Sequence, residues 1–280
     1  MKYGIFLPPF GEFADPRRVA ALAAGAEQAG WDGLFLWDHM LAEPGMAVAD
    51  AWTTMAAMAM TTSRLRFGPM VTPLARRRPW VLARQIATLD QLSGGRLTVG
   101  VGLGDDGWRE FSSFGEETSP KVRGDVLDES LQVLQRLLTG NVVDFAGRHL
   151  SVNAPEFRPA PVQDPVPVWG AVRWPNRRPL VRAAGLQGCF PIFADSGYLP
   201  PPPEVAELAE LRVALDALYV PRSFDVVLRI ALHKLTPVAR GDAVAAMTGA
   251  GVTWLLEAFA PGQDADQVEG YVRSGPPAAG

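Results

Sequence analysis

The sequence lacks several features that would place it in common classes of protein. Its one cysteine, Cys189, allows no internal disulfide, and no Cys–His cluster offers a structural zinc site. The 26 basic residues are outweighed by 30 acidic ones, so no strong positive field exists to hold nucleic acid or an anionic membrane. There is no apolar run of about 18 residues, and the apolar start at 1–7 is too short for the core of a signal peptide. We therefore expect a soluble cytoplasmic protein without a metal, nucleic-acid or membrane partner.

Glycine and proline, by contrast, are abundant. The 28 glycines and 25 prolines make up about 19% of the 280 residues, against a usual ~12%. They follow no three-residue period, which excludes collagen, and a hydrophobic fraction of 48% excludes extensive disorder. A chain of this length is typical of one α/β barrel domain. We predict a single domain over 1–273 and a flexible tail at 274–280.

Apolar runs of strand length alternate with segments of helical periodicity along the whole chain. The continuous character of these runs indicates a parallel sheet that is buried on both faces. Eight such units favour a closed (β/α)₈ TIM barrel over an open doubly wound sheet. We predict a loop insertion after the fourth strand, at 105–120, and a hairpin at 141–152 before the fifth. The eight strands are expected at 2–7, 32–37, 65–71, 96–102, 166–171, 189–193, 225–232 and 252–259.

The carboxyl ends of barrel strands carry the chemistry in this fold, so candidate site residues are expected there. The second strand ends in Trp37-Asp38-His39. An imidazole beside a carboxylate could transfer a proton or orient a heterocyclic ligand. The alternative is an aspartate that caps a helix beside a structural histidine.

Prolines and glycines mark the next two strand ends. Pro69 and Pro73 would interrupt a central strand, which indicates either a kinked exit or a bulged backbone that faces a ligand. The fourth strand ends in the series Gly100, Gly102 and Gly104. A long loop follows, where a dinucleotide site would need a helix, so we interpret these glycines as allowing close approach of a flat ring or of backbone.

Later strand ends leave further alternatives open. Gly170-Ala171 and Arg173 precede a predicted helix, and they could bind a phosphate or could form part of a solvated basic face. Cys189 is more typical of a buried small hydrophobe than of a nucleophile. Lys234, at the end of the seventh strand, raises the minor alternative of a Schiff-base aldolase.

Several of these segments together resemble the bacterial-luciferase-like superfamily of flavin- and deazaflavin-dependent oxidoreductases. The resemblance runs from the start of the chain to about residue 192. The motifs that carry it are YGIFLPPFG, GLFLWDHM, ARRRPWVLARQIATLDQLSGGRLTVGVGLG, VPVWGAVRWPNRRP and AAGLQGCFPI. It implies a (β/α)₈ barrel that is usually a homodimer and binds FMN or the deazaflavin F420 at the strand carboxyl ends.

The resemblance also implies roles for individual residues. Asp38 and His39 would lie near the reactive ring, as in the deazaflavin-using branch, and Asp105 would be an active-site polar residue. A non-proline cis peptide against the ring would fall at Met70-Val71-Thr72. Gly170-Ala171 and the neighbouring Gly188-Cys189 would hold the cofactor phosphate. The cofactor-binding residues are thus predicted as Met70, Val71, Thr72, Gly102, Gly104, Gly170, Ala171, Arg173, Gly188 and Cys189.

These roles define the function that we expect. Hydride transfer needs a ring held flat, a substrate stacked on it and water excluded, and His39 would exchange the balancing proton. The expected function is an oxidoreductase that transfers hydride to or from a small organic substrate, with F420 slightly favoured over FMN. The alternatives are an FMN monooxygenase supplied by a separate flavin reductase and a non-catalytic flavin-binding relative.

Overall fold

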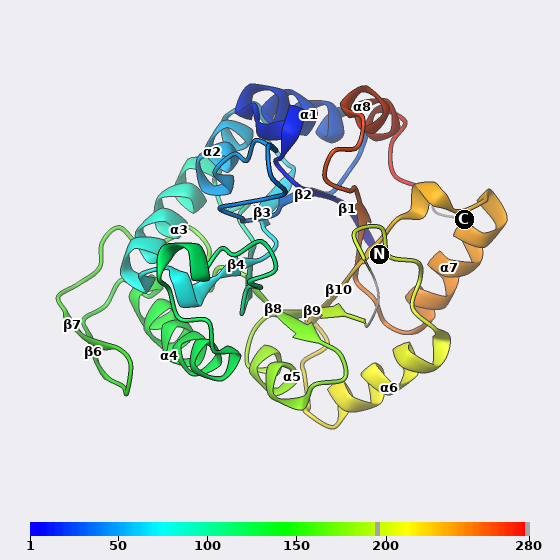
Figure 1. Cartoon of the computed structure of the whole chain (residues 1–280). Coiled ribbons are helices and arrows are strands. Elements are labelled where there is room, and N and C mark those ends of the chain that lie inside the picture. Colours follow the sequence, from blue (N-terminus) through cyan, green and yellow to red (C-terminus); the bar gives the residue numbers. More distant parts are fainter. Residues whose placement is uncertain (194–196, 278–280) are drawn as a thin grey trace.

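Parallel strands form a closed ring at the centre of the molecule, and helices surround it (Figure 1). The computed structural model describes residues 1–193 and 197–277, so the last part of the predicted tail, 278–280, lies outside the described residues. The ring follows the order β3-β2-β1-β11-β10-β9-β8-β5-β4. Its strands are β1 (Lys2–Leu7), β2 (Gly33–Leu36), β3 (Arg66–Pro69), β4 (Thr72–Pro73), β5 (Val99–Gly102), β8 (Val168–Arg173), β9 (Gly188–Ile192), β10 (Asp225–Ile230) and β11 (Trp254–Ala258).

The third strand position of the barrel is divided into two short strands. A cis peptide bond between Met70 and Val71 separates β3 from β4, which confirms the predicted position of a non-proline cis bond. β3 pairs with β2, whereas β4 pairs with β5. The ring closes where Thr98 donates to the carbonyl of Phe67 at 2.9 Å. The predicted (β/α)₈ architecture is therefore confirmed, with one interrupted strand.

Each connecting helix begins at a signal that is visible in the sequence. Asp15 accepts a hydrogen bond from the amide of Arg17 at 2.9 Å, and Asp50 accepts one from Thr53 at 2.7 Å. Such side-chain caps satisfy amides that have no partner within the helix. The helices are α1 (Pro16–Gln28), α2 (Ala51–Thr61), α3 (Pro79–Ser93), α4 (Pro120–Leu138), α5 (Arg177–Ala184), α6 (Val205–Asp216), α7 (Pro237–Gly249) and α8 (Ala265–Arg273). Short 3₁₀ turns lie at η1 (Gly11–Ala14), η2 (Leu74–Arg76), η3 (Ser112–Phe114) and η4 (Leu232–Lys234).

Two segments differ from the simplest β/α repeat. The predicted hairpin is confirmed as β6 (Val143–Ala146) and β7 (Ser151–Ala154), which project outside the ring of helices (Figure 1). The proline run 200–203 precedes α6, which begins at Val205. Each proline disfavours helical geometry in the residue before it, so the run itself is not helical.

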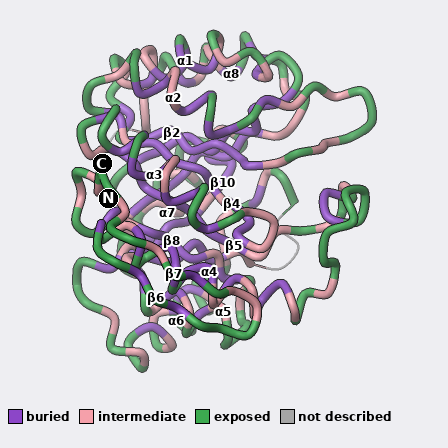
Figure 2. Tube along the Cα trace, turned by 90° about the vertical axis from the view of Figure 1, so that its left-hand side faces the viewer, coloured by how far each residue is buried: buried purple, intermediate pink, exposed green. Residues whose placement is uncertain are grey.

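The buried residues form two groups that lie inside and outside the barrel wall. Figure 2 shows the buried positions running through the middle of the molecule, with exposed positions on the outer helices and loops. Inside the barrel, Phe35, Trp169 and Trp254 pack against one another with ring centroids 5.2–5.7 Å apart. Outward-facing strand residues pack under the helices. The filled interior leaves the carboxyl ends of the strands as the place for a ligand.

Residues 1–193 and 197–277 contain neither a membrane-spanning helix nor a cluster of metal-ligating side chains. No helix there combines the length and the apolar character needed to cross a membrane. Within the same residues, three or more His, Cys, Asp or Glu side chains nowhere gather in a way that could hold a metal ion.

Candidate active site

Aromatic side chains gather around His39 at the carboxyl ends of β1 and β2. The ring centroid of His39 lies 4.9 Å from that of Trp108 and 5.8 Å from those of Phe10 and Trp37. Tyr198 contacts both Trp37 and Trp108, at 5.9 and 6.2 Å. The His39 side chain is 26% exposed. The structure thus places His39 in an apolar aromatic wall from which a ligand can reach it.

A buried carboxylate that the sequence reasoning missed holds the His39 ring. Oε2 of Glu110 lies 2.6 Å from Nδ1 of His39, and Glu110 is only 2% exposed. The same carboxylate accepts hydrogen bonds from the amides of Met40 and Leu41. Burial alone would raise the pKa of Glu110, but the hydrogen bond from His39 and the charges of His39 and Arg76 hold it below its ordinary value. An ionised Glu110 fixes the proton of His39 on Nδ1 and leaves Nε2 for exchange with a ligand.

Asp38 points away from His39 and into the barrel wall. Its carboxylate accepts hydrogen bonds from Thr72 Oγ1 at 2.7 Å, from Arg77 at 2.6 Å and from the indole of Trp52 at 3.2 Å. These partners come from β4, from the residue after η2 and from α2. Asp38 therefore ties together the elements behind the site, and its predicted place near the reactive ring stays a prediction.

Small residues form the opposite side of the strand ends. A Cβ atom built on Gly102 would lie 2.6 Å from Cγ2 of Val71 and 3.3 Å from Cβ of Ala171. The end of β5 thus lies close to the segment after the cis bond and to the end of β8. The structure brings the predicted residues Met70, Val71, Thr72, Gly102 and Ala171 together here. Gly104 follows them in a left-handed conformation (φ 74°), packed against Pro73 and Phe111.

Other predicted residues lie elsewhere. Asp105 is exposed, and its carboxylate accepts a hydrogen bond from the amide of Gly107 at 2.9 Å. Gly170 faces outward, because a Cβ atom there would lie 2.9 Å from Ala183 of α5. Gly188 and Cys189 begin β9, where they pair in register with Trp169 and Gly170 of β8. Their predicted role in holding a cofactor phosphate stays a prediction.

Burial explains the state of the lone thiol. Cys189 is fully buried in the layer between strands and helices. This burial raises the pKa of the thiol to about 12, so the thiolate that a nucleophile requires is not formed near neutral pH. The interpretation of Cys189 as a small core residue fits this environment.

The arginines at the end of β8 and on α5 differ in their contacts. Arg173 ends β8, is exposed and pairs in register with Ile192. Arg178 instead forms ion pairs with Asp125 at 2.6 Å and Asp128 at 2.7 Å on α4. Arg173 is thus exposed at the strand end, whereas Arg178 is held by carboxylates of α4.

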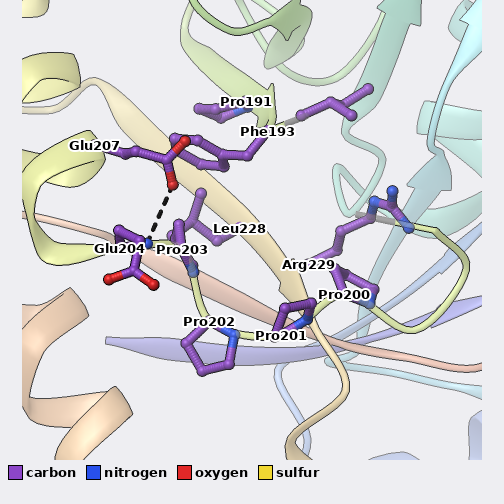
Figure 3. Close-up of a pocket in the computed structure, with 11 residues that line it drawn as sticks. Pro191, Phe193, Pro200, Pro201, Pro202, Pro203, Glu204, Glu207, Leu228 and Arg229 are labelled. Carbon is purple, nitrogen blue, oxygen red and sulfur yellow. Dashed lines mark hydrogen bonds between the residues drawn. The ribbon is translucent and has the colours of Figure 1, made fainter. Parts of the chain in front are cut away.

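A cavity of about 160 Å³ lies beside these strand ends, between β9, β10 and the start of α6 (Figure 3). Proline side chains form much of its lining, and Glu207 closes one side by accepting a hydrogen bond from the amide of Glu204 at 3.1 Å. Arg229 lines the cavity from β10, with its guanidinium 5.8 Å from the centre of the Phe6 ring. Burial lowers the pKa of Arg229 to about 10, which still leaves it cationic.

The remaining chemically active side chains near β10 lie apart from the aromatic wall. His233 Nδ1 is 2.7 Å from Glu257 Oε1, and the Tyr271 hydroxyl donates to Oε2 of the same carboxylate at 2.7 Å. Lys234 on η4 is exposed to solvent. A Schiff-base lysine needs a desolvated pocket or a neighbouring cation that lowers its pKa, so this position does not favour the aldolase alternative.

The residues present fit a flat aromatic cofactor at the strand ends. The backbone of Gly102 is approached closely by the side chains of Val71 and Ala171, so these three residues would lie against one edge of such a ring. The indole Nε1 of Trp37 is buried and has no hydrogen-bond partner among the described residues. A buried donor without a partner costs free energy unless a ligand or water accepts its hydrogen bond. The site therefore offers a buried donor without a partner and a partly exposed histidine.

Comparison with known proteins gives the family and the fold. Residues 1–185 match the family of luciferase-like monooxygenases. Among solved structures, monooxygenase RslO1 from Streptomyces bottropensis is similar, with 20% identity, TM-score 0.79 and coverage of 98% of this chain and 97% of that one. The F420-dependent tetrahydromethanopterin reductase from Methanopyrus kandleri shows 17% identity, TM-score 0.74 and 97% coverage of both chains.

A third similar structure contains a bound flavin. It is the oxygenating constituent of 3,6-diketocamphane monooxygenase from Pseudomonas putida in complex with FMN, with 17% identity and TM-score 0.72. The match covers 98% of this chain and 95% of that one. These structures share the barrel fold. The family match extends over more than half of the sequence, so the chain belongs to the luciferase-like monooxygenase family.

Proposed function

We propose that this protein is an oxidoreductase that binds a flavin-type cofactor at the strand carboxyl ends and transfers hydride to or from a small organic substrate. The observation that carries the proposal is the His39–Glu110 pair, which lies among aromatic side chains at the barrel end where Val71, Gly102 and Ala171 also meet. The cofactor would supply the hydride chemistry. The protein would hold the ring flat, exclude water and exchange one proton at Nε2 of His39.

Each part of the site has a task in this proposal. Glu110 accepts the Nδ1 proton of His39 and stabilises the imidazolium when Nε2 takes up a proton. Phe10, Trp37 and Trp108 shield the site from water, so that the charges act in a medium of lower dielectric constant. Arg173, at the end of β8, would meet the anionic side chain of the cofactor. Asp38 supports the site from behind through Thr72 and Arg77.

F420 is slightly favoured over FMN, because the resemblance of Asp38-His39 is to the deazaflavin-using branch. The similarity to an F420-dependent reductase supports this preference, and the similarity to an FMN complex supports the alternative. That alternative is an FMN monooxygenase, which would receive reduced flavin from a separate reductase. Titration of the purified protein with F420 and with FMN, followed by absorbance and fluorescence, distinguishes them. Micromolar F420 binding without FMN binding supports our preference, and the reverse contradicts it.

The catalytic part of the proposal has a separate test. Once a cofactor and substrate are identified, His39→Ala should lower turnover by at least about 100-fold, because the loss of a general acid or base costs 10²–10⁴-fold. Cofactor affinity should change by less than about fivefold, since the aromatic wall and the small residues remain. Unchanged turnover in His39→Ala would show that the site binds the cofactor without using this proton, as in a non-catalytic relative.

The proposal also covers the domain extent, the cellular location and the oligomeric state of the protein. We expect one domain over 1–273, a cytoplasmic location and a homodimer. Sedimentation equilibrium tests the last of these directly. A mass near twice the 30.2 kDa of the chain supports a dimer, and a mass near 30.2 kDa excludes one at the concentration used.

A further inference from the structure

Arg76, on η2, contacts both acidic residues of the site. One of its terminal nitrogens donates to the carbonyl oxygen of Asp38 at 2.6 Å and lies 3.7 Å from Oδ1 of the same residue. The other terminal nitrogen forms an ion pair with Oε1 of Glu110 at 3.1 Å. The Arg76 side chain is 6% exposed, so water screens these contacts weakly. A single rigid guanidinium thus joins the end of β2 to the loop after β5.

The two oxygens of Glu110 have different partners. Oε2 faces the Nδ1 atom of His39, whereas Oε1 faces Arg76 and the amides of Met40 and Leu41. The cation and the imidazole therefore lie on opposite sides of the carboxylate. The hydrogen bonds of both oxygens fix the rotation of the carboxylate, and the positive charge of Arg76 beside Oε1 favours its ionised form.

The loop that carries Glu110 is also anchored through Arg76. The guanidinium of Arg76 lies 5.8 Å from the centre of the Phe111 ring, and that of Arg123 on α4 lies 4.3 Å from it. The amide of Phe111 donates to Asp106 at 2.8 Å. Phe111 is 1% exposed, so the residue after Glu110 is held between two cations and the protein core.

We propose that Arg76 is a positioning residue for the proton-exchanging pair: it keeps Glu110 ionised and aligned, so that His39 is held by Nδ1 and presents Nε2 to the substrate. The effect on turnover rests on the proposed function, whereas the effect on Glu110 does not. The charged groups that face the carboxylate are His39 and Arg76. Asp38, Arg77, Arg123 and Asp106 lie in the surrounding layer and act through these two groups or through Phe111.

The test is a carbon-13 NMR titration of the Glu110 carboxyl in the whole chain, without cofactor or substrate. Replacing Arg76 by glutamine removes the cation from Oε1 but keeps a polar side chain of similar reach. The pKa of Glu110 should then rise by at least about one pH unit, the size of effect that a contacting cation has on a carboxylate. A pKa within about 0.3 units of the parent value would overturn the proposal.

Arg77→Gln is the matched control. Arg77 pairs with Oδ1 of Asp38 at 2.6 Å and lies over the Trp52 ring, but its charge does not contact Glu110. The pKa of Glu110 should stay within about 0.3 units of the parent value in this variant. An equal rise in both variants would show that general loosening of the site is responsible, which also overturns the proposal.

Arg76→Lys separates charge from alignment and serves if Arg76→Gln does not fold. A lysine keeps the positive charge but has no planar fork to bind Asp38 and Glu110 together. The acid limb of the pH profile of kcat should stay at the parent pH, because the positive charge beside Glu110 is kept. The value of kcat should fall about tenfold at unchanged KM, because misalignment of the carboxylate disturbs the reacting geometry. Parent-level kcat in Arg76→Lys would contradict the positioning role. The NMR titration of the Glu110 carboxyl tests the effect of Arg76 on Glu110 whether or not an oxidoreductase activity is found.

Discussion

Neighbouring side chains at a strand end serve different purposes in this protein. Asp38 and His39 were predicted to lie together near the reactive ring, and the structure gives them different partners. Asp38 binds Thr72, Trp52 and Arg77, and His39 contacts Glu110 on the loop after β5. Both residues follow the end of β2 at Leu36, where the regular strand geometry has ended. The partner of His39 comes from another element.

Glu110→Gln tests that partner at the level of one residue. The amide keeps the size of the side chain but removes the negative charge that stabilises a protonated His39. Turnover should fall by about 10²-fold, within the range found for general acid–base groups, and cofactor affinity should change little. Steady-state kinetics with the identified substrate measures the effect.

The control for this variant lies on the same loop. Glu116 is exposed, and Glu116→Gln should leave turnover within about twofold of the parent value, because surface charges contribute little. A similar fall in both variants would mean that any loss of charge on this loop disturbs the site, which contradicts a specific role for Glu110.

At the scale of elements, a carboxylate joins α1 to the segment before β3. Glu27 accepts hydrogen bonds from the amides of Ser63, Arg64 and Leu65, at 2.9, 2.5 and 2.7 Å. Partial burial opposes ionisation, but these bonds outweigh it and lower the pKa of Glu27 from 4.5 to about 2. The ionised form is therefore more stable in the folded chain than in the unfolded one.

Glu27→Gln should destabilise the protein in a manner that depends on pH. A depressed native pKa stabilises the fold fully above the unfolded value of 4.5, and this stabilisation disappears as the pH falls towards 2. We expect a loss of about 1–2 kcal/mol near neutral pH, after allowance for solvent screening. Urea unfolding of both proteins at several pH values measures the difference. The unfolding free energies of the parent and of Glu27→Gln should converge as the pH falls towards 2. A difference that stays constant with pH would contradict a depressed pKa of Glu27 in the folded protein.

The closure of the barrel depends on a glycine of β3. A Cβ atom on Gly68 would lie 1.6 Å from the carbonyl oxygen of Thr98, in the backbone that completes the ring. Gly68→Ala should therefore cost more than about 4 kcal/mol or prevent folding, because backbone has to move. Gly25→Ala on α1 is the control. It has open space around it and should gain up to about 1 kcal/mol. Circular dichroism and thermal unfolding compare the two, and a stable Gly68→Ala barrel would refute this account of closure.

For the whole molecule, periodicity was sufficient to predict the architecture but not the complete site. Apolar runs and helical spacing gave the order of strands and helices, because each reflects burial on a local face. Glu110 was not predicted as a site residue, because it lies in a loop without hydrophobic periodicity. No local sequence pattern there distinguishes an inward-facing carboxylate from an exposed one. The notion of a phosphate turn at Gly188-Cys189 came from the family resemblance alone, because no local pattern shows which residues of a strand reach a ligand. These two residues begin β9 and pair with Trp169 and Gly170.

The stability of the whole barrel should report which cofactor it binds. A ligand that binds only the folded state stabilises it by RT ln(1 + [L]/Kd), or about 2.7 kcal/mol at a hundredfold excess over Kd. For a chain of this size that corresponds to a rise in Tm of about 5 °C or more. We expect F420 to produce this rise, and FMN at the same concentration to produce less, because the Asp38-His39 pair resembles the deazaflavin-using branch. Lys234→Gln should respond as the parent does, since Lys234 is exposed on η4. A larger rise with FMN would favour the monooxygenase alternative, and no rise with either would mean that the aromatic wall around His39 faces a different ligand.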